Sequence, residues 1–256
     1  MKAQIIVQPQ MPHQVEWCGA MARGLERHGV TIGNDGDFSV CWGWRVGEQC
    51  AGDVLVMERG HVGDRNQYAS CGWNGLGRRG QYATGTADRW RNAWVRLLSP
   101  WRYTNGYALI LGQCPGDMSL ATMMCTMEQW AQNVTDQLIA DGRTVVYRPH
   151  PANGGDYIPT GALPATASLA DDLAGAAMAV TWNSTSAVEA VLSGVPTVTC
   201  DEGAMAWPVT SHSLDEPLIT PDRYQWCADL AWSQFSMQEI ESGMAWEHLR
   251  GFINGA

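Results

Sequence analysis

Charged residues, phenylalanine and closely spaced cysteines are scarce in this chain of 256 residues. Only 16% of the residues are charged and 45% are hydrophobic, which allows a sizeable core and argues against wholesale disorder. Three phenylalanines stand against thirteen tryptophans, most of which we expect to be structural. The length fits one large α/β domain or two compact ones.

Several motifs are missing. The eight cysteines form no C-x-x-C pair and several lie in apolar runs, which favours reduced, buried thiols over a disulfide framework or a zinc site. H-E-x-x-H is absent, so we expect no metal site and no bound cofactor. The chain has no Walker P-loop, and no G-x-G-x-x-G follows the first predicted strand, which argues against an NTPase or a dehydrogenase.

Long apolar runs are missing too. The segment from Met1 to Val7 is followed at once by Gln8 and Pro9, so its apolar run is too short for a signal peptide. No stretch approaches the ~20 apolar residues of a membrane helix. These features predict a soluble, cytoplasmic protein with no membrane span.

The formal net charge of −10 argues against a general nucleic-acid binder, but the charge is uneven. Six arginines lie between Arg78 and Arg102, against the single acid Asp88. Tryptophans among these arginines are compatible with a basic patch facing a polyanionic acceptor. The alternative is an amphipathic helix from Ala87 to Leu98 with a solvated arginine face.

Strand and helix patterns alternate along the chain, which is typical of doubly wound α/β folds. The predicted strands are 5–7, 39–42, 54–57, 107–111, 144–147, 178–181 and 194–199, and the predicted helices are 12–28, 119–140, 169–176, 184–192, 224–232 and 237–253. The glycine-rich segment 60–86 is predicted to be irregular. We therefore expect two Rossmann-like lobes around a central cleft, with residues 1–104 on the acceptor side. Residues 105–256 form the nucleotide-sugar lobe, and the C-terminal helices pack back on the first lobe.

Two polar segments end predicted buried strands in the second half. In Val145-Val146-Tyr147-Arg148-Pro149-His150-Pro151 the strand ends near a cation and a titratable ring. The second segment, 179–190, passes through Asn183 into a helix that opens with Ser184, Thr185 and Ser186 and carries Glu189 one turn later. Free N–H groups and the dipole at a helix start favour phosphate, so these segments predict a seat for a sugar nucleotide. The alternative is a helix capped by Ser184 near a salt-bridged arginine.

A third segment, Leu111-Gly112-Gln113-Cys114-Pro115-Gly116-Asp117-Met118-Ser119, also follows a predicted strand. Asp117 is either a nucleophile or base that projects into the cleft, or a plain helix N-cap, for which aspartate is favoured. Gln113 is placed to hydrogen-bond a sugar hydroxyl. The spacing leaves both interpretations of Asp117 open.

His13 lies just after the first predicted strand, at the start of the first helix. Its ordinary pKa near ~6.5 suits a general base that removes a hydroxyl proton. An exposed histidine in a first helical turn is the alternative. Asp117 and His13 imply different stereochemical outcomes.

The order Gln113-x-x-x-Asp117-x-Ser119, then Arg148-Pro149-His150-Pro151, then Asn183-Ser184-Thr185-Ser186-x-x-Glu189-Ala190 resembles the motifs of capsular-polysaccharide Kdo transferases and related GT-B glycosyltransferases. The likeness covers roughly residues 106–198. It implies that Arg148 and His150 contact the donor phosphates, that Ser184 to Ser186 hold phosphate, and that Glu189 binds the nucleotide ribose. It also implies that Asp117 is a catalytic nucleophile.

The first half carries a different resemblance. Glu58-Arg59-Gly60-His61-Val62-Gly63-Asp64-Arg65, followed by Gly72-Trp73-Asn74-Gly75-Leu76, is similar to segments of bacteriophage-encoded proteins of glycosyltransferase type. Such enzymes often modify hydroxymethylated pyrimidines such as 5-hydroxymethylcytosine in DNA. The resemblance implies an acceptor side with Glu58, Arg59, Arg65, Trp73 and Asn74. The basic segment 78–102 would suit a DNA acceptor, and we expect Arg89 and Arg91 to contact it.

These observations together predict a compact, metal-independent GT-B glycosyltransferase. Its preferred acceptor is a 5-hydroxymethylpyrimidine in phage DNA, which would place it in the host cytoplasm. The alternatives are a transferase of surface polysaccharide or lipid-linked glycan and a non-catalytic module that binds sugar nucleotides or nucleic acid. The nucleotide of the donor, UDP, GDP or CMP, is left open.

Overall fold

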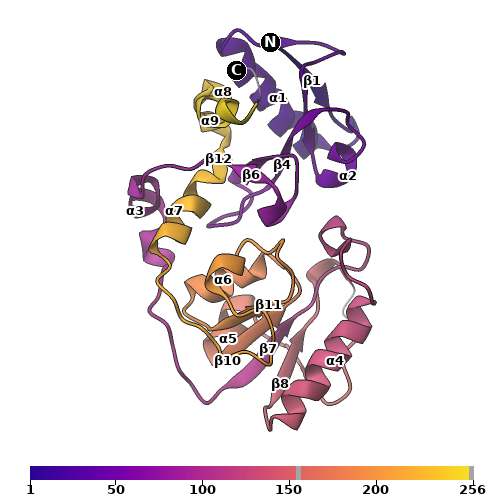
Figure 1. Ribbon diagram of the computed structural model, residues 1–256, viewed down its shortest axis with the longest axis vertical. Helices are drawn as coiled ribbons and strands as arrows, with labels where there is room; N and C mark the ends of the chain where they lie inside the picture. The colour runs from indigo at the N-terminus through magenta and orange to yellow at the C-terminus, as the bar shows by residue number, and fades with distance from the viewer. Residues whose placement is uncertain (154–156, 254–256) are drawn as a thin grey trace. The chain divides into compact units, whose positions relative to one another are not determined.

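The computed structural model describes residues 1–153 and 157–253. Its contacts divide the chain into two compact units (Figure 1). Unit 1 comprises Met1–Trp94 and Tyr224–Ala256, and unit 2 comprises Val95–Arg223. The C-terminal helices thus belong to unit 1, and the division falls ten residues before the expected boundary at 104.

Unit 1 contains a seven-stranded mixed sheet in the order β12-β5-β4-β3-β1-β2, with β6 paired to β5. The parallel strands are β1 (Lys2–Ile6), β2 (Thr31–Ile32), β3 (Phe38–Trp42) and β4 (Asp53–Arg59). The antiparallel strands are β5 (Tyr68–Trp73), β6 (Gln81–Tyr82) and β12 (Gln234–Ser236).

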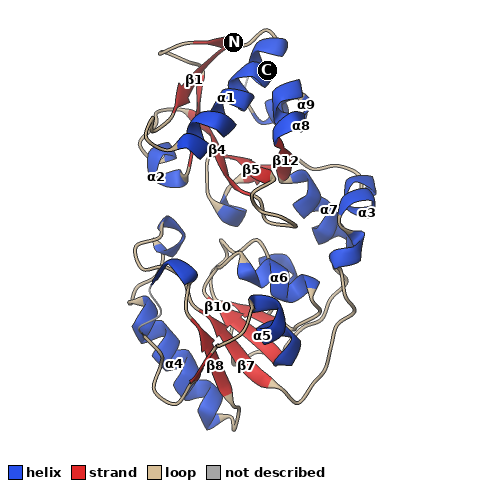
Figure 2. Cartoon of the chain, turned by 180° about the vertical axis from the view of Figure 1, so that it is seen from behind, coloured by secondary structure: helices blue, strands red, loops and turns tan. Residues whose placement is uncertain are grey.

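The helices of unit 1 come from both ends of the chain (Figure 2). They are α1 (Pro12–Arg27), α2 (Trp44–Gly47), α3 (Asp88–Ala93), α7 (Tyr224–Trp232), α8 (Met237–Ser242) and α9 (Met244–Leu249), with 3-10 turns at Gly77–Arg79 and Arg250–Phe252. As expected, α1 begins at Pro12 and stops before Gly29, whose φ of +76° is easy only for glycine. Gly24 lets α1 approach α8 closely, because a β-carbon there would lie 2.1 Å from the Ile240 carbonyl oxygen.

Aromatic rings fill the core of unit 1. Phe38 stacks on Trp246 with ring centroids 5.2 Å apart and meets the edge of Trp73 at 5.4 Å. The Trp73 indole N–H is also satisfied, since it donates to the Leu249 carbonyl oxygen at 2.9 Å. Several of the tryptophans are therefore structural, as the composition predicts.

Unit 2 is built on a five-stranded, fully parallel sheet in the order β11-β10-β7-β8-β9. The strands are β7 (Tyr107–Leu111), β8 (Val145–Arg148), β9 (Leu163–Pro164), β10 (Ala176–Thr181) and β11 (Thr197–Thr199). The helices are α4 (Met127–Ala140), α5 (Leu169–Gly175) and α6 (Ser186–Leu192), with 3-10 turns at Val95–Leu97, Met118–Leu120, Pro151–Asn153 and Trp207–Val209.

Helices cover both faces of the unit 2 sheet, as parallel strands require. Ala108 and Ile110 of β7 pack against α4, whereas Leu109 and Leu111 of the same strand lie on the side of α5 and α6. Figures 1 and 2 show this sandwich from opposite sides. The expected α/β class, with parallel strands in both units, is confirmed.

Local boundaries differ from the prediction in several places, of which two are instructive. Residues 60–86 contain β5 and β6, so this segment is not wholly irregular. The predicted helix 119–140 is a 3-10 turn followed by α4, which starts at Met127. Thr126 and Gln129 form a capping box there, a T-x-x-Q signal that is readable in the sequence.

No helix in the described part of the chain is long and apolar enough to cross a membrane. The eight cysteines all lie in the described residues and are all free thiols. Four of them are buried: Cys18, Cys41, Cys71 and Cys227.

Candidate functional site

The three donor-side segments lie at the same edge of the unit 2 sheet. Strands β8, β7 and β10 are parallel neighbours, so Arg148, Leu111 and Thr181 end their strands side by side. In open α/β sheets, ligands bind outside the carboxyl ends of the strands. The tertiary structure therefore brings together segments that are 30 or more residues apart in the sequence.

Gln113 and Asn183 form a buried hydrogen-bonded pair at this edge, with 6% and 8% of their surfaces exposed. The Gln113 amide nitrogen donates to Asn183 Oδ1 at 2.8 Å and to Ser119 Oγ at 3.1 Å. Gln113 Oε1 accepts the Asn183 backbone N–H at 2.9 Å. Both amide protons of Gln113 are thus used inside the protein, which favours a positioning role over contact with a sugar hydroxyl.

Arg148 is half-buried and pairs with Asp172 of α5, a residue that the sequence did not single out. Arg148 Nη1 lies 2.5 Å from Asp172 Oδ2 and also donates to the Ala167 carbonyl oxygen at 2.8 Å. The salt-bridged arginine of the alternative interpretation is therefore present. A phosphate contact by Arg148 stays a prediction.

His150 is exposed beyond β8, and its Nδ1 accepts the Ala152 backbone N–H at 3.2 Å. Ser184, Thr185 and Ser186 are half-buried where α6 begins, and Ser184 Oγ accepts the Ser186 backbone N–H at 3.2 Å. Glu189 is exposed in the first turn of α6. The predicted donor ligands thus follow β8 and β10, two strands that end at the same edge of the unit 2 sheet.

Asp117 is exposed and caps the 3-10 turn Met118–Leu120, where its carboxylate accepts the Ser119 backbone N–H at 2.8 Å. The capping interpretation is therefore realised. A cap with an exposed carboxylate remains free to act as a nucleophile, so the catalytic role of Asp117 stays a prediction.

In unit 1, His13 is half-buried in the first turn of α1, at the carboxyl end of β1. Its ring meets the edge of Trp42, the last residue of β3, with centroids 5.2 Å apart. His13 therefore lies at the carboxyl edge of the parallel strands of unit 1, the edge at which ligands of open α/β sheets bind. Its catalytic role is not decided by this position.

The predicted acceptor residues near β4 and β5 have mixed surroundings. Glu58 and Arg59 are half-buried at the end of β4, and the exposed Arg65 donates through Nε to the Gly60 carbonyl oxygen at 2.9 Å. Trp73 is fully buried, and the Asn74 side chain bonds the Val54 backbone N–H and Asp53 Oδ1. Trp73 and Asn74 thus have structural partners, and the geometry gives Trp73 no face to stack on an acceptor.

Arg89 and Arg91 differ sharply although they are two residues apart. The Arg89 side chain is 10% exposed and donates to both Glu239 oxygens and to the carbonyl oxygens of Ala231 and Gln234. The Arg91 side chain is 57% exposed and pairs with Asp88 at 3.2 Å. Arg89 is therefore a core cation, a position that does not suit a contact with a DNA backbone.

His61, just beyond the end of β4, has a ring that is buried without a hydrogen-bond partner for either nitrogen. Burial, together with the charge of Arg65, lowers the pKa of His61 to about 3. In the unfolded chain a histidine titrates near ~6.5. Its stabilising contribution is thus fully present above that pH and is lost as the pH falls toward the folded pKa.

The free energy of unfolding is therefore expected to fall by up to ~1.4 kcal/mol per pH unit below pH ~6.5 because of His61 alone. His61→Phe removes the titration and should flatten this slope. Urea denaturation of both proteins between pH 7 and pH 5 measures it. Parallel pH profiles for wild type and His61→Phe would contradict the assignment.

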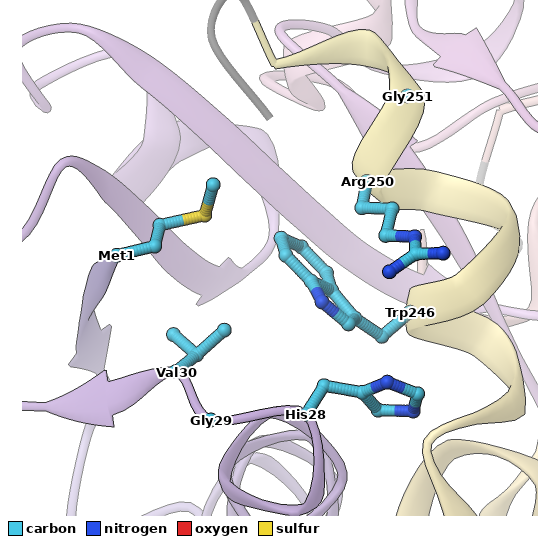
Figure 3. Close-up of a pocket in the computed structure, with 7 residues that line it drawn as sticks. All are labelled: Met1, His28, Gly29, Val30, Trp246, Arg250 and Gly251. Carbon is cyan, nitrogen blue, oxygen red and sulfur yellow. The ribbon is translucent and has the colours of Figure 1, made fainter.

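A separate pocket of about 480 Å³ lies in unit 1, lined by Met1, His28, Gly29, Val30, Trp246, Arg250 and Gly251 (Figure 3). It sits where β1 begins and α1 ends, at the amino end of the strands. Ligands of α/β sheets bind at the opposite edge, so this pocket is not part of the candidate site. In residues 1–153 and 157–253, no group of three or more acidic, histidine or cysteine side chains is arranged to hold a metal ion.

No protein-family model matches the chain, and no curated protein matches it. Among solved structures, it is similar to a β-Kdo 2,7-transferase KpsC of Thermosulfurimonas dismutans, with a TM-score of 0.56, 13% identity and coverage of 95% of this chain and 98% of the other. A β-Kdo 2,4-transferase KpsC of the same organism aligns with a TM-score of 0.59 and 12% identity over 91% of this chain and 92% of the other. A UDP-GlcNAc 2-epimerase of Methanocaldococcus jannaschii, crystallised with UDP-GlcNAc and UDP, aligns at a TM-score of only 0.37 and 11% identity over 99% of this chain and 100% of the other.

Identities of 13% and 12% show a shared fold and nothing finer. The similarity spans almost the whole of each chain, so it includes both units. The chain thus has the GT-B-like α/β fold of the two Kdo transferase structures.

Proposed function

We propose that this protein is a glycosyltransferase that moves a sugar from a nucleotide-sugar donor to a hydroxyl group of a glycan. The observation that carries the proposal is the junction in unit 2, where the segments of Gln113, Arg148 and Asn183–Ser186 meet at the carboxyl edge of a parallel sheet. The fold of the two Kdo transferases supports the same conclusion.

The donor is proposed to bind with its phosphate at the start of α6. Ser184, Thr185 and Ser186 offer hydroxyl and backbone N–H groups. Arg148 offers a guanidinium group and His150 an imidazole ring at the end of β8, which is separated from β10 by β7. Glu189, one turn into α6, is proposed to accept hydrogen bonds from the ribose hydroxyls. Protein cations and N–H groups would then neutralise the leaving phosphate, with no metal required.

Transfer breaks the bond between the anomeric carbon and the donor phosphate, and the nucleotide leaves with the bonding electrons. If Asp117 is the nucleophile, its carboxylate first takes the sugar as an ester, and the acceptor oxygen then displaces it. The acceptor proton passes to a base. Two displacements retain the anomeric configuration, whereas a single direct attack by the acceptor oxygen inverts it.

A glycan acceptor, in a surface polysaccharide or a lipid-linked glycan, is favoured over hydroxymethylated DNA. The net charge of −10 opposes approach to a polyanion, and the buried ion pair of Arg89 removes one cation from the expected basic patch. Both similar structures are named as Kdo transferases.

The deciding experiment incubates the protein with UDP-, GDP- and CMP-sugars and with model glycans or hydroxymethylated DNA, followed by mass spectrometry. Sugar addition to a glycan supports the proposal. Addition only to DNA, weakening steeply with salt, would replace the glycan by DNA as acceptor. Tight nucleotide-sugar binding with neither transfer nor donor hydrolysis would indicate a non-catalytic binding module.

Arg148 gives a sharper test of the donor site, because its partner Asp172 can be neutralised as well. Arg148→Ala with Asp172→Asn removes the cation without leaving a buried carboxylate unpaired, and should weaken nucleotide binding about tenfold or more. Asp172→Asn alone keeps the cation and is the matched control, with affinity close to wild type. Calorimetry with CMP, UDP and GDP measures this, and equal affinities for the double variant and the control would remove Arg148 from the donor site.

A further inference from the structure

Asp201 lies just after β11 and connects three loops of unit 2, yet no motif in the sequence points to it. Its side chain is buried, with 7% of the residue exposed. Asp201 Oδ1 accepts the Asn183 amide N–H and the Gly203 backbone N–H, each at 2.9 Å. Asp201 Oδ2 accepts the Thr122 hydroxyl at 2.7 Å.

The Asp201 carboxylate and the Ser119 carbonyl oxygen together fix the direction of the hydrogen-bond chain, because both accept from the Asn183 amide nitrogen. A carboxylate only accepts, so the amide nitrogen of Asn183 must face Asp201 and its oxygen must face Gln113. Gln113 then presents its nitrogen to Asn183 Oδ1 and its oxygen to the Asn183 backbone N–H. A rotated Asn183 amide would oppose nitrogen to nitrogen at Gln113 and oxygen to oxygen at Asp201 and Ser119, which is costly in a buried place.

The chain of bonds also joins the segments on which the reacting groups lie. Asn183 donates to the Ser119 carbonyl oxygen at 2.6 Å, two residues beyond Asp117. It precedes Ser184, whose loop starts α6, and Thr122 belongs to the connection between the 3-10 turn and α4. A single buried carboxylate thus ties the proposed nucleophile segment to the proposed phosphate seat.

We propose that Asp201 is a positioning residue, which sets the Gln113–Asn183 pair and so holds the 117–122 loop and the start of α6 in register for donor binding and transfer. The inference rests on the proposed function for its effect on catalysis. Asp201 contacts neither the donor nor the reacting atoms in this role, and it acts through Asn183 and Thr122.

Two substitutions of Asp201 distinguish the effect of its hydrogen bonds from the effect of its negative charge. Asp201→Ala removes all three bonds and should weaken binding of CMP, UDP or GDP, whichever the wild type binds, by about tenfold and lower kcat further. Asp201→Asn can keep its oxygen toward Asn183 and Gly203 and donate to the Thr122 hydroxyl, which accepts as well as donates. The asparagine variant should therefore restore both parameters. Asp215→Ala is the matched control, because this exposed aspartate of unit 2 bonds only side chains outside the network, Gln137 and Ser213.

A second readout needs no activity. The side-chain amide protons of Gln113 and Asn183, identified in ¹⁵N spectra by substituting each residue, should exchange slowly in wild type and Asp201→Asn and quickly in Asp201→Ala. Slow exchange in Asp201→Ala would overturn the inference, whatever the protein is found to transfer. Loss of function in Asp201→Asn with slow exchange retained would also overturn it, since the charge would then matter rather than the geometry.

If Asp201→Ala does not fold, Thr122→Val removes one bond, and unchanged exchange and kinetics in that variant would contradict the coupling to the 117–122 loop.

Discussion

Replacing Asp117 by asparagine is expected to lower the rate of sugar transfer by on the order of 10³-fold or more, with little change in nucleotide affinity. Asparagine cannot serve as the carboxylate nucleophile. It is as good an N-cap as aspartate, however, and its side-chain oxygen can still accept the Ser119 N–H that Asp117 binds at 2.8 Å. The substitution thus removes the chemistry and keeps the turn.

Asp117→Ala completes this test, because alanine removes both the nucleophile and the cap. If Asp117 is the nucleophile, the asparagine and alanine variants are equally inactive, and NMR of the wild-type product shows retention of the donor's anomeric configuration. An asparagine variant as active as wild type, together with an inverted product and an inactive His13→Ala, would reduce Asp117 to a helix cap. His13→Ala should be the milder change if Asp117 acts covalently.

Arg89→Ala is expected to destabilise unit 1 by up to about 3 kcal/mol, the lower end of the range found when one partner of a buried ion pair is removed, because the Glu239 side chain is 25% exposed. The guanidinium binds both oxygens of Glu239 and two backbone carbonyl oxygens, and it also lies over the rings of Trp94, Trp232 and Phe235. Without Arg89, the Glu239 carboxylate keeps the hydrogen bonds from the backbone N–H and the hydroxyl of Ser236 but no longer has a cation beside it. Arg91→Ala, two residues away, removes an exposed pair and should change stability by less than about 1 kcal/mol.

The same ion pair makes unit 1 sensitive to acid. Burial by itself would raise the pKa of Glu239, but the hydrogen bonds and charge of Arg89 and the bonds from Ser236 outweigh it and lower the pKa below the ordinary value. The stabilisation is therefore present above the pKa of an unfolded glutamate and is lost as the pH falls through the folded pKa. Thermal unfolding of wild type, Arg89→Ala and Arg91→Ala measures the effect, and equal melting temperatures for the two variants would refute the structural role of Arg89.

The fold class was predictable because the periodicity of apolar residues and the signals at helix ends are local features of the sequence. Apolar runs such as 107–111 and 178–181 alternate with amphipathic helices, and Pro12 and Gly29 mark the ends of α1. β5 escaped the prediction because Ala69, Ser70, Cys71 and Gly72 lack the branched and aromatic side chains of typical strands. It forms a strand because β4 and the distant β12 pair with it on either side.

For the candidate site too, the sequence predicted individual residues but not their tertiary partners. The types and order of Gln113, Asp117, Arg148, Asn183 and Ser184–Ser186 were available from the sequence, together with the strands that end at them. The sequence did not predict the partners Asp172 and Asp201. Neither carboxylate lies in a recognisable motif, so its role depends on the residues that it contacts in the folded protein. Arg89 is the converse case, an arginine in a basic stretch that tertiary contact places in the core.

The sequence by itself determined the α/β class and the identity of the polar groups at the ends of the strands, because strand and helix periodicity and helix-capping chemistry act over a few residues. Only the tertiary structure decided which arginines are solvated and that Asp201 accepts a hydrogen bond from Asn183. These outcomes depend on contacts between residues far apart in the chain, which the local sequence pattern does not predict. In a buried place the loss of one hydrogen-bond partner is costly, so the identity of that partner decides the role of a polar side chain.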